Sequence, residues 1–252
     1  MKEIERVLDI ALSVGEEIIR AGGEVSRAED SVSRICLAFG MSRCDVFAIN
    51  TYITISIEGN EGESAVKSRR IRGRVTDLKK LERINSLSRD ICSGVVDIST
   101  AEIMILDMAD IRKGNALKNY VISTAVCGTF TLFFGGGIKE AIASIIAAGI
   151  MVFLKRTAKN GFGNAVIFTF VCSFLGGMIG AFLVRCGFAE DYSVIAKGDI
   201  MLLVPGVSLV CAGRDLISGE LLTGVLELIE ALLIAVALAA GFALPESFLN
   251  LV

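Results

Sequence analysis

The first half of the chain alternates between the periodicity of amphipathic helices and that of strands. Across residues 3–20, apolar side chains recur roughly every 3.6 positions, which predicts an amphipathic helix. The stretch AGGE at 21–24 stops this pattern. Ser26 is the predicted N-cap of a second helix, because Glu29 follows it at capping-box spacing. We expect this helix to end near Phe39, where a glycine follows.

A β pattern follows the two helices. Residues 45–58 are rich in β-branched side chains and alternate clearly from 53 to 57, which predicts a strand. The turn-rich stretch EGNEGES ends it, and residues 64–74 are predicted to return as a second strand. Two further helices are predicted, one over 77–94 with an aspartate cap and one over 99–114 with a serine or threonine start. The first half is therefore predicted to be a small α+β domain.

Long apolar runs replace this pattern from Tyr120 onward. A spanning helix needs about 20 mostly apolar residues. The third and fifth runs reach that length, the second is short enough to be tilted or re-entrant, and the fourth is interrupted by a Pro-Gly pair. The five runs cover residues 119–137, 140–154, 164–184, 193–213 and 221–244.

These patterns together predict the fold class. We expect an α+β soluble N-terminal domain, residues 1–116, followed by an all-α transmembrane bundle of about five helices, residues 117–252. The charges support this division, because residues 1–118 hold 18 Lys/Arg and 19 Asp/Glu, whereas residues 119–252 hold only 7 and 9.

Composition excludes several classes of function. The net charge is −3 and no basic stretch dominates, so no nucleic-acid partner is expected. Histidine is absent, which removes the commonest general base and metal ligand, and we expect neither a metal site nor a cofactor. The seven cysteines form no CxxC pair and are predicted to be apolar fillers in a reducing compartment, with a disulfide framework or a metal site as the alternative. The N-terminus lacks the continuous apolar core of a signal peptide.

The loops between the apolar runs predict an orientation. The connection after the second run carries Lys155, Arg156 and Lys159, whereas the one after the third has a single arginine against Glu190 and Asp191. Positively charged loops stay in the cytoplasm. With five spans, the N-terminal domain would then lie inside and the C-terminus outside.

The fourth run carries the most unusual feature, which is Pro205 followed by Gly206 in an apolar stretch bracketed by charges. Proline removes a helix hydrogen bond, and a freed backbone group in lipid costs several kcal/mol unless protein or water satisfies it. Broken helices supply binding sites in many transporters, because their half-helix ends present partial charges. A simple kink with a packing role is the alternative. Asp199 precedes the break and Asp215 follows it.

Two carboxylates fall within the fifth run. Glu227 and Glu230 lie three residues apart and are predicted to share a helix face. An ionisable group at the centre of a span costs at least about 2.5–3.5 kcal/mol, so these residues are candidates for holding a coupling proton or a cation. The alternative is a span that begins near Ala231, which would leave both at the membrane surface.

Small residues in the third run predict close helix packing. The stretch GGMIG at 176–180 is a G-x-x-x-G pattern, and such patterns let helix backbones approach closely. We assign Gly176, Gly177 and Gly180 to packing within the bundle or against a partner.

Several of these stretches resemble the threonine/serine exporter (ThrE) family, specifically its N-terminal half as it occurs in two-component YjjP-type subunits. The stretch GDIMLLVPGVSLVCAGRDLISGELLTG at 198–224 is similar to the family's most distinctive membrane motif: an acid, an apolar run, Pro-Gly, then Arg-Asp and a glycine-bearing turn. The stretch AGGEVSRAEDSVSRICLAFG at 21–40 resembles its glycine-then-acidic helix pair. Residues 47–58 and 67–94 are similar to its strand–strand–helix core.

The resemblance implies a cytoplasmic domain followed by about five spans, and export of small hydrophilic metabolites. These would be threonine and serine, as in fused members, or dicarboxylates such as succinate, as in split ones. Complete members carry roughly twice as many spans, so the resemblance also implies a separate small membrane protein that supplies the C-terminal half. The family motif falls on Asp199, Pro205, Gly206, Asp215 and Gly219.

We therefore expect a subunit of a secondary exporter in a bacterial inner membrane and not an enzyme. A homo-oligomer is left open. The alternative is a membrane-anchored sensory or scaffolding protein whose soluble domain binds a ligand; a membrane-tethered hydrolase is a third, disfavoured by the lack of histidine and of a nucleophile elbow. The candidate pathway residues are Asp199, Pro205, Gly206, Ser208, Asp215, Glu227 and Glu230.

Overall fold

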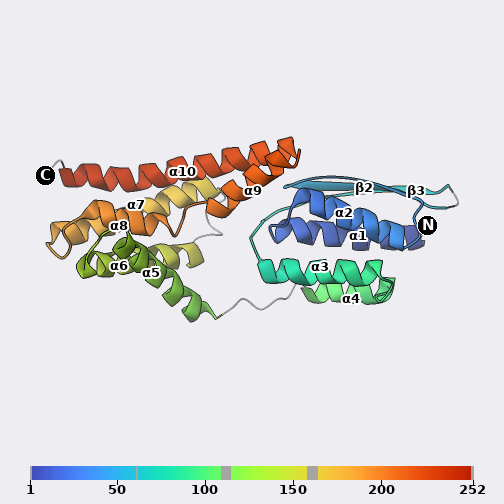
Figure 1. Cartoon of the computed structure of the whole chain (residues 1–252), viewed down its shortest axis with the longest axis horizontal. Helices are drawn as coiled ribbons and strands as arrows, with labels where there is room; N and C mark the ends of the chain where they lie inside the picture. Colours follow the sequence, from blue (N-terminus) through green and yellow to red (C-terminus); the bar gives the residue numbers. More distant parts are fainter. Residues whose placement is uncertain (1, 61, 109–114, 158–163, 251–252) are drawn as a thin grey trace. The chain divides into compact units, whose positions relative to one another are not determined.

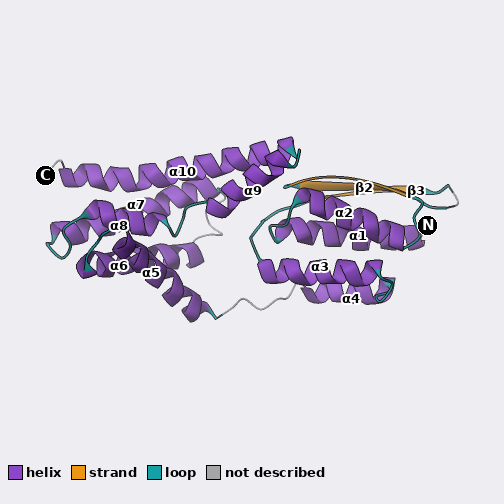
Figure 2. Ribbon diagram, in the orientation of Figure 1, coloured by secondary structure: helices purple, strands orange, loops and turns teal. Residues whose placement is uncertain are grey.

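The structure is a computed structural model that describes residues 2–60, 62–108, 115–157 and 164–250. These residues form ten helices and one three-stranded sheet, and the sheet is confined to residues 43–70 (Figures 1 and 2). The chain divides into two compact units. The first is Met1–Arg112 with Cys211–Val225, and the second is Lys113–Val210 with Leu226–Val252.

The first unit is built in three layers. Its elements are α1 (Lys2–Arg20), α2 (Val25–Ala38), β1 (Arg43–Ile49), β2 (Tyr52–Glu58), β3 (Ser64–Arg70), α3 (Leu78–Cys92) and α4 (Ile98–Met108). The strands pair antiparallel in the order β1-β2-β3 and pack on one side of α1 and α2, while α3 and α4 pack on the other side (Figure 1). Because α1 and α2 lie in the middle layer, they carry much of the unit's core.

Buried and partly exposed side chains alternate along β2, and the buried ones are the sheet's contribution to that core. Ile53, Ile55 and Ile57 are fully buried, whereas the residues between them are partly exposed. Successive side chains of a strand point to opposite faces, so one face packs on the helices and the other stays polar. Each fully buried isoleucine contributes about 1.5–3 kcal/mol through the apolar surface that it removes from water.

Two local predictions in this unit differ from the structure. The predicted strand over 45–58 is in fact two strands, because a tight turn at Asn50 and Thr51 joins β1 to β2 in an antiparallel hairpin. The predicted cap Ser26 is also wrong: α2 begins at Val25, so Glu24, two residues before Ser26, occupies the N-cap position, without a side-chain hydrogen bond. The cap predicted at the start of α3 is confirmed, since Asp77 accepts a hydrogen bond from the Lys80 amide.

The remaining helices account for the five apolar runs. They are α5 (Ala116–Phe133), α6 (Ile138–Thr157), α7 (Ala165–Arg185), α8 (Tyr192–Ile200), α9 (Gly206–Ile217) and α10 (Leu221–Asn250). The fourth run is divided between α8 and α9, with the break at the Pro-Gly pair. Within the second unit, α5, α6, α7 and α8 pack on one another.

The predicted fold class, an α+β domain followed by a separate bundle of about five transmembrane helices, is wrong. The described chain is mostly helical, with ten helices and one small sheet, and its second half contributes six helices. Residues 211–225 also belong to the first compact unit, so the later helices do not form a bundle of their own. The physical reason is a charge contact, because Arg214 on α9 forms an ion pair of 2.8 Å with Glu24 at the start of α2.

Two of the described helices are long and apolar enough to cross a membrane. They cover Ala165–Arg185 and Leu221–Ser247, which are the third and fifth runs. The other apolar helices are shorter or carry more charge, so length and composition alone do not distinguish them from helices buried in protein.

A close approach of two helices in the second unit is testable at Gly198. A Cβ added there would overlap the Thr131 hydroxyl and come within 2.9 Å of the Cys127 carbonyl oxygen, so α8 and α5 would have to separate. We expect Gly198→Ala to destabilise the protein by about 1–3 kcal/mol, measured as the thermal unfolding midpoint in detergent. Gly213→Ala on α9 is the matched control, because a Cβ there meets nothing within 4 Å. An unchanged midpoint for Gly198→Ala would contradict the packing described here.

Candidate functional site

A buried carboxylate lies where α8 meets α5 and α6. Asp199 has 0% exposure and accepts a hydrogen bond of 2.6 Å from the Ser144 hydroxyl through its Oδ1 atom. Its Oδ2 atom is equally buried and has no hydrogen-bond partner among the described residues. Burying a polar atom without a partner is unfavourable, and for an ionised carboxylate the penalty is larger still. The site therefore has an unused capacity to hold a proton, a cation or a hydrogen-bond donor.

Small residues bring the three helices close enough to bury this group. Ser144 lies on the face of α6 that also carries Ala143, Ala147 and Ala148, all fully buried. On α5, the Thr131 hydroxyl donates to the carbonyl oxygen of its own helix at Cys127 and packs on the glycine before Asp199. Side chains of this size allow close backbone approach, which is how polar groups are held between membrane helices.

Contacts at its N-terminus fix the position of α8. Asp191 is its N-cap and accepts hydrogen bonds from the amides of Ser193 and Val194. The Tyr192 hydroxyl donates to the Phe242 carbonyl oxygen on α10 at 2.8 Å. The helix is therefore anchored at its start and carries the buried carboxylate in its last turn.

The chain leaves α8 directly after the carboxylate and starts again at Gly206. The carbonyl oxygens of Asp199 and Ile200 accept the amides of the next turn, and the Pro205 carbonyl oxygen accepts the amide of Leu209. Pro205, Gly206 and Ser208 are partly exposed, and Val210 on the same stretch is 74% exposed. The break thus separates a buried acidic helix end from an apolar surface.

The second charged end of the motif belongs to the first compact unit. Asp215 is 4% exposed, its carboxylate contacts Arg214 at 3.5 Å, and its carbonyl oxygen accepts the Glu220 amide. Gly219 has a φ of 92°, which explains why this turn between α9 and α10 needs glycine. Asp199 lies in the second unit, so the two motif acids are described in separate units.

Glu29, on α2 in the first unit, has a raised pKa. Burial raises the pKa of Glu29 above its ordinary value, and nearby Glu220 raises it further, while the hydrogen bond that its carboxylate accepts from the Ala48 amide opposes both effects. Glu29 was the predicted capping-box residue of α2. It instead connects that helix to β1 through the Ala48 amide.

The two carboxylates of α10 differ in burial. Glu227 is 6% exposed and lies on the same face as the buried Thr223 and Ala231, whereas Glu230 is exposed. The structure therefore does not bring the two together in one buried site, although they are three residues apart.

The three glycines assigned to packing all lie in buried contacts of α7. A Cβ on Gly176 would overlap the Met151 sulfur, and one on Gly177 would come within 2.8 Å of the Tyr192 hydroxyl. Gly180 leaves room for Ile195 on α8, with a closest approach of 3.3 Å. Their roles in assembly beyond this chain remain a prediction.

The described residues contain no group of three or more Cys, Asp or Glu side chains that could hold a metal ion. All seven cysteines lie within these residues and are free thiols. At Asp199, the carboxylate and the Ser144 hydroxyl offer acid–base and hydrogen-bonding chemistry.

Sequence reasoning missed Ser144 and Thr131 as members of this site. Both lie in long apolar runs, where Thr131 is one of several hydroxyl residues of α5, and the hydrogen bond from Ser144 to Asp199 spans 55 positions. An intrahelical hydrogen bond of the Ser or Thr hydroxyl explains such residues in most membrane helices. A pattern in this one sequence could not have singled them out.

The comparison with protein families identifies the group to which this sequence belongs. The ThrE model, described as "Putative threonine/serine exporter", matches residues 9–248. The chain belongs to this family. Family membership confirms the resemblance seen in the motif, and it makes the chain a membrane protein of an exporter family and not an enzyme.

Two relatives are similar over nearly the whole chain. One is the "Probable threonine/serine exporter" of Mycobacterium tuberculosis, 20% identical over 94% of this chain and 45% of that protein. The other is the "Probable succinate transporter subunit YjjP" of Klebsiella aerogenes, 20% identical over 89% of this chain and 86% of that protein. The chain thus spans less than half of the mycobacterial relative. No solved structure matches it.

The raised pKa of the partly buried Glu29 predicts how stability depends on pH. Because its pKa is higher in the folded protein than in the unfolded chain, its ionisation favours unfolding, and stability is lost as the pH rises from the unfolded pKa through the folded one. Glu29→Gln removes this titration and keeps an acceptor for the Ala48 amide. We expect the variant's thermal midpoint, relative to wild type, to rise as the pH increases above the ordinary pKa of a glutamate. Glu82→Gln, on the exposed face of α3, is the control; a midpoint difference for Glu29→Gln that is constant or falls with pH would contradict the assignment.

Proposed function

We propose that the chain is a subunit of a secondary exporter of small hydrophilic metabolites and that Asp199 is the polar centre of its membrane part. One observation carries the proposal: a carboxylate with 0% exposure has a single hydrogen-bond partner and one oxygen without any among the described residues. A helix that only anchors or packs gains nothing from such a group, since its burial is unfavourable. Proton uptake or solute binding during a transport cycle gives the unused oxygen a role.

The proposed substrates are threonine- or serine-type amino acids or dicarboxylates such as succinate. The names of the two relatives support these classes, because one is called a threonine/serine exporter and the other a succinate transporter subunit. All of these solutes carry a carboxylate, and none has a large apolar surface. The backbone groups around Pro205 and Gly206, together with the Ser208 hydroxyl, are the proposed contacts for them.

We propose an inner-membrane location in a bacterium with the N-terminal unit in the cytoplasm and the C-terminus outside. The proposed boundary between the cytoplasmic and membrane parts lies near residues 116–117. The ion pair between Arg214 and Glu24 supports this orientation, because the predicted topology puts the end of the fourth run on the cytoplasmic side. Asp215 would lie at that mouth of the pathway.

We further propose that a small membrane protein supplies the C-terminal half of the transporter. The Klebsiella relative, of which this chain covers 86%, is named a subunit, whereas the mycobacterial exporter is about twice as long as the matched region. This chain and such a partner would together be about as long as the mycobacterial relative.

The proposal is tested by Asp199→Asn, introduced at the native locus. We expect efflux of threonine, serine or succinate from preloaded cells to fall about tenfold or more, because a change of about 1.4 kcal/mol in any rate-limiting step is enough. Ser144→Ala removes the donor to the same carboxylate and should reduce efflux by a smaller factor.

The matched control is Glu246→Gln, an exposed carboxylate on α10. Immunoblotting of membranes establishes that every variant is present at the wild-type level. If Asp199→Asn exports all three solutes as wild type does, the buried carboxylate is not part of the transport path.

Glu227 and Glu230 form a matched pair for proton coupling. They lie on one helix three residues apart, but only Glu227 is buried. We expect Glu227→Gln to alter the dependence of efflux on external pH and Glu230→Gln to leave it as in wild type. Identical pH profiles for both variants and wild type would remove α10 from the coupling mechanism.

A further inference from the structure

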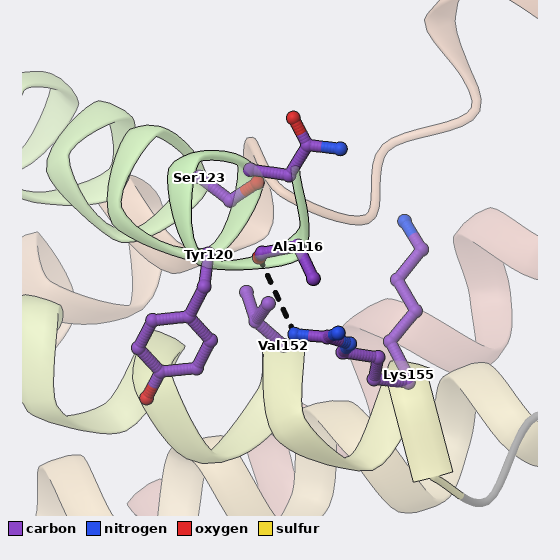
Figure 3. A pocket seen from close by; sticks show the side chains of 7 residues that line it. Ala116, Tyr120, Ser123, Val152 and Lys155 are labelled. Atoms are coloured by element: carbon purple, nitrogen blue, oxygen red, sulfur yellow. Dashed lines mark hydrogen bonds between the residues drawn. The ribbon is translucent and has the colours of Figure 1, made fainter. Parts of the chain in front are cut away.

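A pocket outside the family motif opens between the start of α5 and the end of α6. It has a volume of about 400 Å³. Figure 3 shows Tyr120 and Ser123 of α5 lining it opposite Val152 and Lys155 of α6. Ala116, Asn119 and Arg156 complete the lining. None of the transport residues proposed above contributes to it.

The lining is suited to an anion. Lys155 and Arg156 bring two positive charges, and none of the seven described lining residues is acidic. One guanidinium nitrogen of Arg156 donates to the Ala116 carbonyl oxygen at 3.3 Å, which ties the arginine to the start of α5 (Figure 3). Its other N–H groups remain able to donate to a ligand. The Asn119 amide and the Ser123 hydroxyl add uncharged donors.

The N-terminus of α5 strengthens this preference. Asn115 caps the helix by accepting the Leu117 amide, and the pocket lies over the first two turns that follow. The start of a helix carries a partial positive charge, which favours an anion at that place.

Outside the pocket, α5 and α6 expose apolar side chains on their other faces. Val121 and Ile122 on α5, and Ile150 and Phe153 on α6, expose between 41% and 59% of their surface. In a chain of a membrane exporter family, such side chains lie against lipid tails. A ligand held in this pocket by its anionic group can extend hydrocarbon toward these neighbouring apolar faces, which a small free anion does not do.

We infer that this pocket binds the phosphate of an anionic phospholipid, with the acyl chains along the exposed faces of α5 and α6. Basic pockets between membrane helices on the cytoplasmic side recognise such headgroups. The guanidinium of Arg156 contacts the phosphate oxygens, Lys155 supplies a second charge, and the Asn119 amide and the Ser123 hydroxyl add hydrogen bonds. The bound lipid would hold the start of α5 against the end of α6, independently of transport at Asp199.

The test is a lipid titration of the full-length protein, purified in detergent and followed by native mass spectrometry. Phosphatidylglycerol should bind at one site per chain and phosphatidylcholine should not. Lys155→Gln should weaken phosphatidylglycerol binding about tenfold, as expected for the loss of one charged contact. Lys118→Gln is the matched control, because this exposed lysine lies in the same turn of α5 but does not line the pocket; it should change binding less than about twofold.

Ser123→Ala removes a hydroxyl of the lining without changing charge and should weaken binding by a smaller factor, so the inference stays testable if Lys155→Gln folds poorly. Equal binding of the two lipids, or equal weakening by Lys118→Gln and Lys155→Gln, would overturn the inference. Inorganic phosphate and succinate form the third arm: if millimolar concentrations of either displace the lipid completely, the site is one for a soluble anion. None of these binding results changes the efflux expected of the Asp199 variants, so the two proposals are tested independently.

Discussion

The second compact unit depends on how a carboxylate is tolerated between helices. Asp199 is withdrawn from solvent by three helices, yet only Ser144 donates to it among the described residues. The small side chains of α6 and the glycine before Asp199 make that burial geometrically possible. A stable protein would satisfy or remove such a group if it served structure alone, because an unpaired buried polar atom is unfavourable. Its position at the end of α8, directly before the helix break, connects the acid to the most distinctive motif of the family.

The helix break also helps to explain why the chain is not a soluble domain followed by a separate helix bundle. Ending α8 at Ile200 and restarting the chain at Gly206 allows α9 to reach the first compact unit, where Arg214 pairs with Glu24. An exposed ion pair contributes little stability. Here it does not act alone, because Asp215 is buried at the same place and Gly219 turns the chain into α10.

The sequence predicted those features that depend on local chemistry. The long apolar runs became α7 and α10, the Pro-Gly pair became a helix break, and Asp77 caps α3. Features that depend on packing were not accessible. The partner of Asp199 is 55 residues away in an apolar run, and nothing in a nearly all-apolar helix predicts that Glu227 is buried while Glu230 is exposed. Helix faces of this kind are determined by neighbours and not by amphipathic periodicity.

Chemical modification of Asp199 in native membrane vesicles tests the central claim most directly. A hydrophobic carbodiimide reacts with carboxyl groups in apolar surroundings, and peptide mass spectrometry reports the modified fraction of each acidic residue. The account predicts that Asp199 is modified and that saturating transported solute, whether threonine, serine or succinate, changes its modified fraction while that of exposed Glu230 stays constant. An Asp199 fraction that is the same with and without each solute, in vesicles that transport it, would contradict the account.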